Sequence, residues 1–194
     1  MIPIKLTLDG FLSYREKVEL DFVQIDVACV IGRNGAGKSS LLDAITWGLF
    51  GKARSSDDDL VNLSTKRAIV WFEFSYEDQH YRIERSKKKG STKQVMLNVW
   101  DPEDELWTDF SEGTNKQTQE KIERILRMDY DTFINASFFL QGKADQFAQQ
   151  RPSDRKKTLA KILELDIWES RKLRVAEKRK KLDMDLAVLD SRLD

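Results

Sequence analysis

Alternating apolar and polar positions in the first hundred residues predict a series of half-buried β-strands. The alternation is clear in residues 2–8 and in residues 18–22, and residues 10–14 form a turn between them. Three further strand patterns follow, in residues 67–76, 79–85 and 94–100. Because their connections are short or flexible, we expect these strands to form an antiparallel meander.

An uninterrupted apolar run, residues 27–31, predicts a central strand that is covered on both faces. Cys29 lies inside this run, so we expect a buried and unreactive thiol. A glycine-rich segment follows directly. Residues 39–50 then have the pattern of a helix that ends at Gly51.

The C-terminal part of the chain predicts a long helix. Residues 115–126 and 131–139 look helical, and from Ser153 onward no residue stops a helix. Apolar residues then recur every seven positions, at Trp168, Val175, Leu182 and Leu189. This spacing predicts the base of a coiled coil, and a single amphipathic helix docked on the domain is the alternative. A coiled coil requires a second helix from another chain or from a longer form of this one.

Charge is unevenly distributed along the 194 residues, although 33 basic and 33 acidic side chains balance overall. Residues 151–181 hold 12 Lys or Arg and 5 Asp or Glu, so an anionic macromolecule is expected to approach this part. Residues 52–66 are polar and acidic and predict a surface loop. The three lysines at 87–89 predict a solvated hairpin tip.

Composition also restricts the compartment and the chemistry. Cys29 is the only cysteine, which excludes a disulfide framework and a cysteine-based metal site. No run of 18 apolar residues is present, so we expect a soluble protein of a reducing compartment, cytoplasmic or in the nucleoid or nucleus, without a membrane partner. His80, the only histidine, falls in a predicted turn and is excluded from catalysis.

The candidate chemistry lies between the apolar run and the helix. Residues 32–39 read Gly-Arg-Asn-Gly-Ala-Gly-Lys-Ser, which satisfies the P-loop pattern in full. Its glycines let backbone N–H groups point at phosphate oxygens, and the helix adds its positive dipole end. Lys38 can reach the β and γ phosphates, and the Ser39 hydroxyl can ligate Mg²⁺. We therefore predict that ATP and Mg²⁺ bind to the loop and the helix start, at Asn34, Gly35, Ala36, Gly37, Lys38, Ser39 and Ser40.

The sequence around this loop, residues 32–51, resembles the N-terminal half of an ABC-type ATPase head of the SMC-like group. Within the group it is most similar to SbcC and Rad50, the ATPases of the double-strand-break repair nuclease complex. Three other stretches agree with the family pattern: the opening turn at 10–14, the Q-loop segment at 138–147 and the exit helix at 155–165. The resemblance implies an α/β P-loop NTPase fold with a mixed sheet plus antiparallel strands, in a lobe of residues 1–152. Residues 153–194 would begin an antiparallel coiled coil.

The resemblance also implies roles for individual residues. Gln141 matches the Q-loop glutamine, whose side-chain oxygen ligates Mg²⁺ and senses the γ-phosphate, so Lys38 and Gln141 are the expected catalytic residues. Asn62 and Leu63 fall where the family packs against the base and ribose. One departure is Leu12, because some members carry an Arg near this turn that helps to hold the nucleotide.

Two family motifs are absent from the sequence. No apolar run that ends in Asp-Glu follows the Q-loop segment, and no Ser-Gly-Gly signature is present. The resemblance therefore implies an N-terminal half that binds ATP but does not turn it over efficiently alone. It also implies four partners: the C-terminal half of the same ATPase, a second head across an ATP-sandwiched dimer, an Mre11/SbcD-type nuclease and double-stranded DNA without sequence preference.

Three other functions are compatible with the sequence. The chain could be the head of another SMC-like protein, of condensation, RecN or RecF type, although the Phe-Leu-Gln-Gly segment at 139–142 favours SbcC and Rad50. A P-loop kinase or stand-alone NTPase would need its own acidic Mg²⁺ ligand and a substrate lid. A DNA-binding scaffold would use the nucleotide only as a structural ligand.

Overall fold

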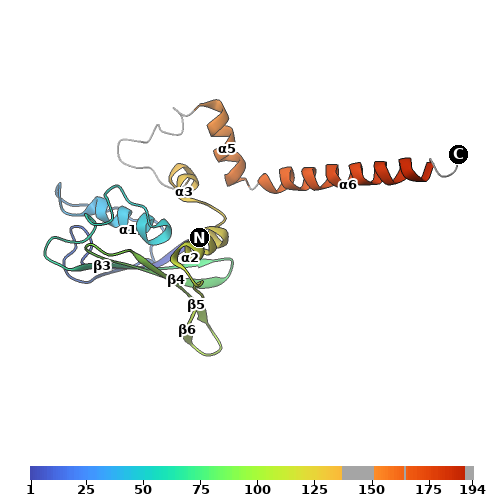
Figure 1. The fold of residues 1–194 in the computed structure, drawn as a ribbon. Helices are drawn as coiled ribbons and strands as arrows, with labels where there is room; N and C mark the ends of the chain where they lie inside the picture. The colour runs from blue at the N-terminus through green and yellow to red at the C-terminus, as the bar shows by residue number, and fades with distance from the viewer. Residues whose placement is uncertain (137–150, 164, 191–194) are drawn as a thin grey trace. The chain divides into compact units, whose positions relative to one another are not determined.

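The computed structural model describes residues 1–136, 151–163 and 165–190 (Figure 1). The chain divides into two compact units, Met1–Tyr130 and Asp131–Asp194. The first unit contains the whole described sheet and the P-loop. The second contains most of α3 (Tyr130–Ala136) and the helices α5 (Pro152–Ile162) and α6 (Asp166–Asp190).

The first unit is built on a six-stranded sheet in which all neighbouring strands are antiparallel. The spatial order is β2 (Val18–Asp21), β1 (Ile2–Asp9), β3 (Arg67–Tyr76), β4 (Gln79–Lys88), β5 (Gln94–Asp101) and β6 (Leu106–Asp109). The alternation patterns and the antiparallel meander are therefore confirmed. The short edge strand β6 was not predicted.

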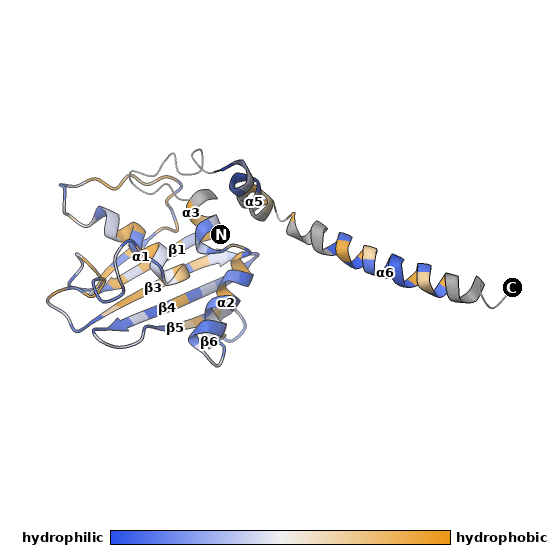
Figure 2. Ribbon diagram, turned by 45° about the horizontal axis from the view of Figure 1, so that its top comes forward, coloured by the Kyte–Doolittle hydropathy of each residue, from blue (hydrophilic) through white to orange (hydrophobic). Residues whose placement is uncertain are grey.

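Strand register places the apolar side chains on one face of the sheet. Leu6 pairs with Phe72, and Phe72 in turn pairs with Ile83, so that all three point to the same side and are buried. The helices α1 (Lys38–Phe50) and α2 (Asn115–Leu126) cover this face. Figure 2 shows the apolar stretches of the central strands beneath them. Because side chains alternate, the opposite face of the sheet is polar.

Helix α1 lies close to the sheet at Gly48. A Cβ at this position would lie 3.4 Å from Val70 Cγ1 and 3.6 Å from Phe72 Cβ, already in van der Waals contact with the strands, so a larger side chain would have to extend into occupied space. The helix ends at Gly51, as the sequence predicts: its φ of 64° is left-handed, and its N–H donates to Trp47 O over 2.8 Å.

The prediction of a buried central strand at residues 27–31 is wrong for this chain. Val27 is 92% exposed, Ile31 is 88% exposed, and no described strand pairs with this segment. A strand covered on both faces requires neighbours in the sheet, and the six described strands pair only with one another. Cys29, predicted to be buried, is exposed for the same reason.

Three smaller predictions also need correction. Lys87 is buried on the core side of β4 instead of lying at a solvated tip, and His80 lies in β4, although it is exposed as expected. The long C-terminal helix is interrupted between α5 and α6. The Leu165 N–H donates to Ala160 O, which spans five residues instead of the four of an α-helix.

The described part of α6 presents its heptad residues to solvent. Trp168, Val175 and Leu182 are each more than 60% exposed. Exposed apolar residues at heptad spacing are typical of a helix that pairs with another helix. The predicted boundary between the lobe, residues 1–152, and the coiled coil, residues 153–194, remains a prediction. Among the described residues, no helix is both long enough and apolar enough to cross a membrane.

Two isoleucines give a direct test of the burial pattern. Ile83→Ala removes a side chain with no exposed surface and should lower the free energy of unfolding by about 2–5 kcal/mol. Ile31→Ala changes an exposed side chain and should alter it by less than about 0.5 kcal/mol. Urea unfolding of both variants measures the difference. Equal losses would mean that residues 27–31 are buried in solution after all.

Candidate functional site

The predicted P-loop forms an irregular turn that leads directly into α1. Gly35 and Gly37 have φ values of 84° and 92°, which an L side chain rarely adopts. Gly37 is also the N-cap of α1, and no side chain caps the helix at this end. The first N–H groups of α1 are therefore available to an anion, and Asn34, Gly35 and Ala36 are exposed beside them.

Lys38 lies across this turn. Its Nζ donates to Gly32 O over 2.6 Å and to Arg33 O over 2.8 Å. Both acceptors are neutral carbonyl oxygens, and charged phosphate oxygens accept from an ammonium group more strongly. The lysine is therefore held at the loop, by partners that an anionic ligand can replace.

Two residues of the opening turn, Ser13 and Tyr14, contact the P-loop and the start of α1. Tyr14 Oη donates to Gly37 O over 3.3 Å, and the hydroxyls of Ser13 and Ser40 lie 3.4 Å apart. A Cβ at Gly37 would lie 3.1 Å from Ser13 Cβ and 3.3 Å from the Tyr14 ring, so this contact as well as the φ value requires glycine. Burial raises the pKa of Tyr14 from its ordinary value, and its hydroxyl is a neutral donor at neutral pH.

Asn62 joins the same turn from another part of the chain. Its Nδ2 donates to Leu12 O over 2.5 Å, and its N–H donates to Gly10 O over 2.8 Å. Leu63, by contrast, is 93% exposed. The structure thus places residue 62 against the turn that contacts Gly37, while Gln141 lies outside the described residues.

The residues present fit a nucleoside triphosphate with Mg²⁺. One ammonium group, the open N–H groups of a helix N-terminus and the hydroxyl of Ser39, which is half-buried next to Lys38, meet at one place. These are donors for phosphate oxygens, together with an oxygen suited to a hard cation. Tyr14 and Ser13 were not predicted as site residues. The sequence signal that could have identified them is the turn 10–14 itself, which was recognised only as a family pattern.

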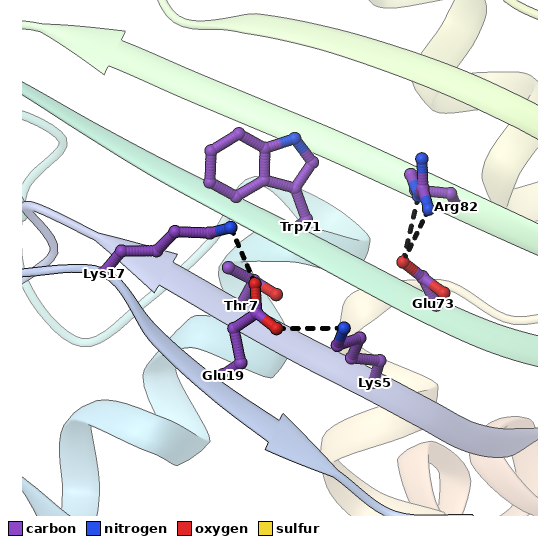
Figure 3. Close-up of a pocket in the computed structure, with 7 residues that line it drawn as sticks. All are labelled: Lys5, Thr7, Lys17, Glu19, Trp71, Glu73 and Arg82. Atoms are coloured by element: carbon purple, nitrogen blue, oxygen red, sulfur yellow. Dashed lines mark hydrogen bonds and ion pairs between the residues drawn. The ribbon is translucent and has the colours of Figure 1, made fainter.

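A second concave region lies on the uncovered face of the sheet (Figure 3). Its volume is about 210 Å³, and it is lined by Lys5, Thr7, Lys17, Glu19, Trp71, Glu73 and Arg82. Its charges are paired with one another: Glu19 with Lys17 over 2.6 Å and with Lys5 over 3.0 Å, and Arg82 with Glu73 over 2.9 Å. Hydrogen bonds from Lys17 and Lys5 lower the pKa of Glu19 to about 2. Because these charges satisfy one another, the P-loop is the better candidate site.

Comparison with known proteins identifies relatives over nearly the whole chain. A family model described as an AAA domain matches residues 5–193. The chain is 32% identical over 167 residues to the SbcC component of the SbcCD nuclease of Deinococcus radiodurans, covering 84% of this chain and 18% of that protein. It is 29% identical over 193 residues to a probable DNA double-strand break repair Rad50 ATPase of Aquifex aeolicus, covering 94% and 18%. The chain thus spans less than a fifth of these relatives.

A solved structure has a similar fold. It is described as "Structural biochemistry of ATP-driven dimerization and DNA stimulated activation of SMC ATPases". The TM-score is 0.59 at 25% sequence identity, and the match covers 84% of this chain and 99% of that one. The chain therefore has the α/β fold of a P-loop NTPase of the ABC-ATPase head type.

Lys38→Ala tests the assignment of the loop. The side chain is bonded only to exposed loop carbonyls, so its removal should leave the unfolding temperature without nucleotide nearly unchanged. It should abolish the upward shift that ATP with Mg²⁺ produces by binding the folded state. Lys89→Ala, at an exposed position after β4, is the matched control and should keep the shift. A Lys38→Ala variant that ATP still stabilises like the parent would contradict the assignment.

Proposed function

The chain belongs to the AAA_23 family of AAA domains, and we propose that it is the ATP-binding N-terminal half of the head of an SbcC/Rad50-type DNA repair ATPase. The observation that carries the proposal is the arrangement at the start of α1. Lys38, the left-handed Gly37 and the uncapped helix N-terminus meet there. Relatives named as a repair ATPase and as a component of a nuclease support the biological setting.

Each residue of the loop has a defined task in this proposal. The N–H groups of residue 35 and of residues 37–39 donate to phosphate oxygens, whereas the Ala36 N–H donates to Arg33 O inside the loop. Lys38 exchanges its carbonyl partners for the β and γ phosphates. Ser39 provides a hydroxyl oxygen for the cation. The Ser39 oxygen would hold Mg²⁺ there, and the cation would supply positive charge against the phosphates. The Tyr14 hydroxyl and ring fix Gly37, so that the cradle is formed before the ligand arrives.

The missing catalytic parts are proposed to come from the C-terminal half of the same ATPase. The segment 27–31 supports this partner, because it is apolar and exposed and pairs with no described strand, so it is suited to adding to a sheet that another part of the ATPase supplies. A second head would contribute charge stabilisation across a dimer that forms around ATP. Gln141 is proposed to sense the γ-phosphate and to ligate Mg²⁺ in that state. An Mre11/SbcD-type nuclease is the proposed further partner.

Phosphate release separates this half-head from a complete NTPase. The chain alone should bind ATP but release phosphate at a rate close to background, since the acidic residue that orients the water is absent. Adding the C-terminal half should restore hydrolysis and ATP-dependent dimerisation together. Gln141→Ala should weaken both while most of the ATP affinity remains. Robust, Lys38-dependent turnover by the chain alone would show that it contains a complete active site.

Double-stranded DNA is the proposed macromolecular ligand of the basic stretch, residues 151–181. In α6 the residues Lys178, Arg179, Lys180 and Lys181 are all exposed, and Arg179 has only a long contact of 3.8 Å to Asp183. Consecutive residues point around the helix, so these charges meet phosphates without reading bases. Binding of this kind is independent of sequence and weakens with salt.

Salt titration of DNA binding tests this surface. Changing residues 178–181 to Gln should weaken binding at low salt and should reduce the slope of log K against log salt by about 2–4. The control changes four exposed basic residues of the first unit to Gln: Lys66, Arg67, Lys88 and Lys89. Affinity that depends on sequence, that is insensitive to salt, or that falls equally in the control contradicts the proposal.

A further inference from the structure

Three side chains enclose the carboxyl end of α1, far from the phosphate-binding end. Arg85 of β4 donates from Nε to Gly48 O over 3.2 Å, and Gln119 of α2 donates from Nε2 to Leu49 O over 3.2 Å. Lys93, just before β5, donates from Nζ to Gly51 O over 2.7 Å. We name these three residues, Arg85, Lys93 and Gln119, the α1 clamp. They satisfy carbonyls that a helix end leaves without partners inside the helix.

Arg85 is the centre of the clamp and is only 2% exposed. Its Nη2 donates to Gln119 Oε1 over 2.6 Å, so one guanidinium group connects α1, β4 and α2. Burial lowers the pKa of Arg85 to about 10 in spite of the attraction of Asp57 and Glu123, and the group therefore stays charged at neutral pH. Burying a charge lowers the stability of the fold through the loss of its hydration, and apolar side chains packed in the same place would avoid this penalty. The binding and repair functions proposed above do not use this buried charge.

The residues around the clamp leave space for the Arg85 guanidinium group and place a carboxylate near it. A Cβ at Gly51 would lie 2.9 Å from Arg85 Nη1, so a side chain at this left-handed position would displace the guanidinium group. Asp57 supplies a carboxylate on the outer side, 3.0 Å from Lys93 Nζ, and also accepts from Trp47 Nε1 over 3.3 Å. The acidic loop at residues 52–66 is thus fixed to the end of α1 through Asp57.

We propose that Arg85 is a positioning residue for phosphate binding and that the α1 clamp sets the orientation of the P-loop helix. This inference rests on the proposed nucleotide function. Helix α1 has 13 residues and is about 20 Å long, so a small tilt at its carboxyl end displaces the N–H groups at its other end. Errors of about 1 Å in such groups are enough to lose much of their effect on a ligand. Cations at the carboxyl end and an anion at the N-terminus also both suit the helix dipole.

The clamp also connects ligand binding to α2. Gln119 accepts from Arg85, donates to Leu49 O and lies 3.0 Å from Glu123 Oε1, so α2 cannot move freely from α1. Energetic coupling between two sites is reciprocal. A phosphate ligand that fixes α1 therefore also stabilises α2, and the signal passes through Gln119.

Four variants of the chain separate positioning from mere stability. Arg85→Met removes the charge at similar volume, Arg85→Lys keeps the charge but loses the fork, and Gln119→Leu breaks the link to α2. Lys87→Met is the matched control. Lys87 is buried on the same face of the same strand, but it bonds to Ser91 O and to Asp58 instead of α1. Titration with a fluorescent ATP analogue and urea unfolding are measured for each, with amide hydrogen exchange of α2 with and without the analogue.

We expect Arg85→Met to raise the Kd for the analogue by about tenfold or more, and Arg85→Lys to recover part of this loss. Lys87→Met should lower stability with less than a twofold change in Kd. In the parent the analogue should slow exchange in α2, and Gln119→Leu should remove this effect. If Arg85→Met does not fold, Gln119→Leu and a fifth variant, Lys93→Met, which removes the bond to Gly51 O, carry the same test and should also raise the Kd.

Two results would overturn the clamp while leaving the proposed function intact: an unchanged Kd in the clamp variants, or an equal rise in Lys87→Met. A parent chain that binds no ATP analogue would instead overturn the proposed function, and the positioning role with it.

Discussion

The close approach of α1 to the sheet is the constraint on which the rest of the site depends. With no side chain at Gly48, the helix lies directly over Val70 and Phe72, and the buried Trp47 and Leu49 pack beside this contact. A bulkier residue would lift the helix from the strands and would move both of its ends. The contact at Gly48 thus determines where both ends of α1 lie: the phosphate-binding loop at its start and the carbonyl groups that the clamp binds at its end.

Much of this arrangement could be predicted from the sequence, because local rules determine it. Period-two alternation identified strands that bury one face, and the glycines at the ends of α1 marked the left-handed positions of its caps. Residues 27–31 could not be predicted correctly in this way. Their apolar composition indicates that the segment is suited to a buried strand. Whether it is buried depends on whether neighbouring strands are present to pair with it.

The charged residues of β4 show that strand alternation predicts burial better than side-chain charge does. Arg85 and Lys87 follow Ile83 at alternate positions, so the strand rule places all three on the core face. Composition alone suggested a solvated basic turn. A charge at an inward position of a strand indicates a partner in the interior, and here the partners are the end of α1 and the acidic loop. By contrast, the break between α5 and α6 could not be predicted, because no glycine or proline occurs there.

The contact between Gly37 and the Tyr14 ring has an evolutionary consequence. A side chain at position 37 would need both a left-handed backbone and space that Ser13 and Tyr14 already fill. The opening turn and the loop therefore cannot change independently. Exchange of Tyr14 for a smaller residue would remove the hydroxyl that donates to Gly37 O and would leave a void next to the loop, so a tyrosine at position 14 is expected to be retained together with the glycine at position 37.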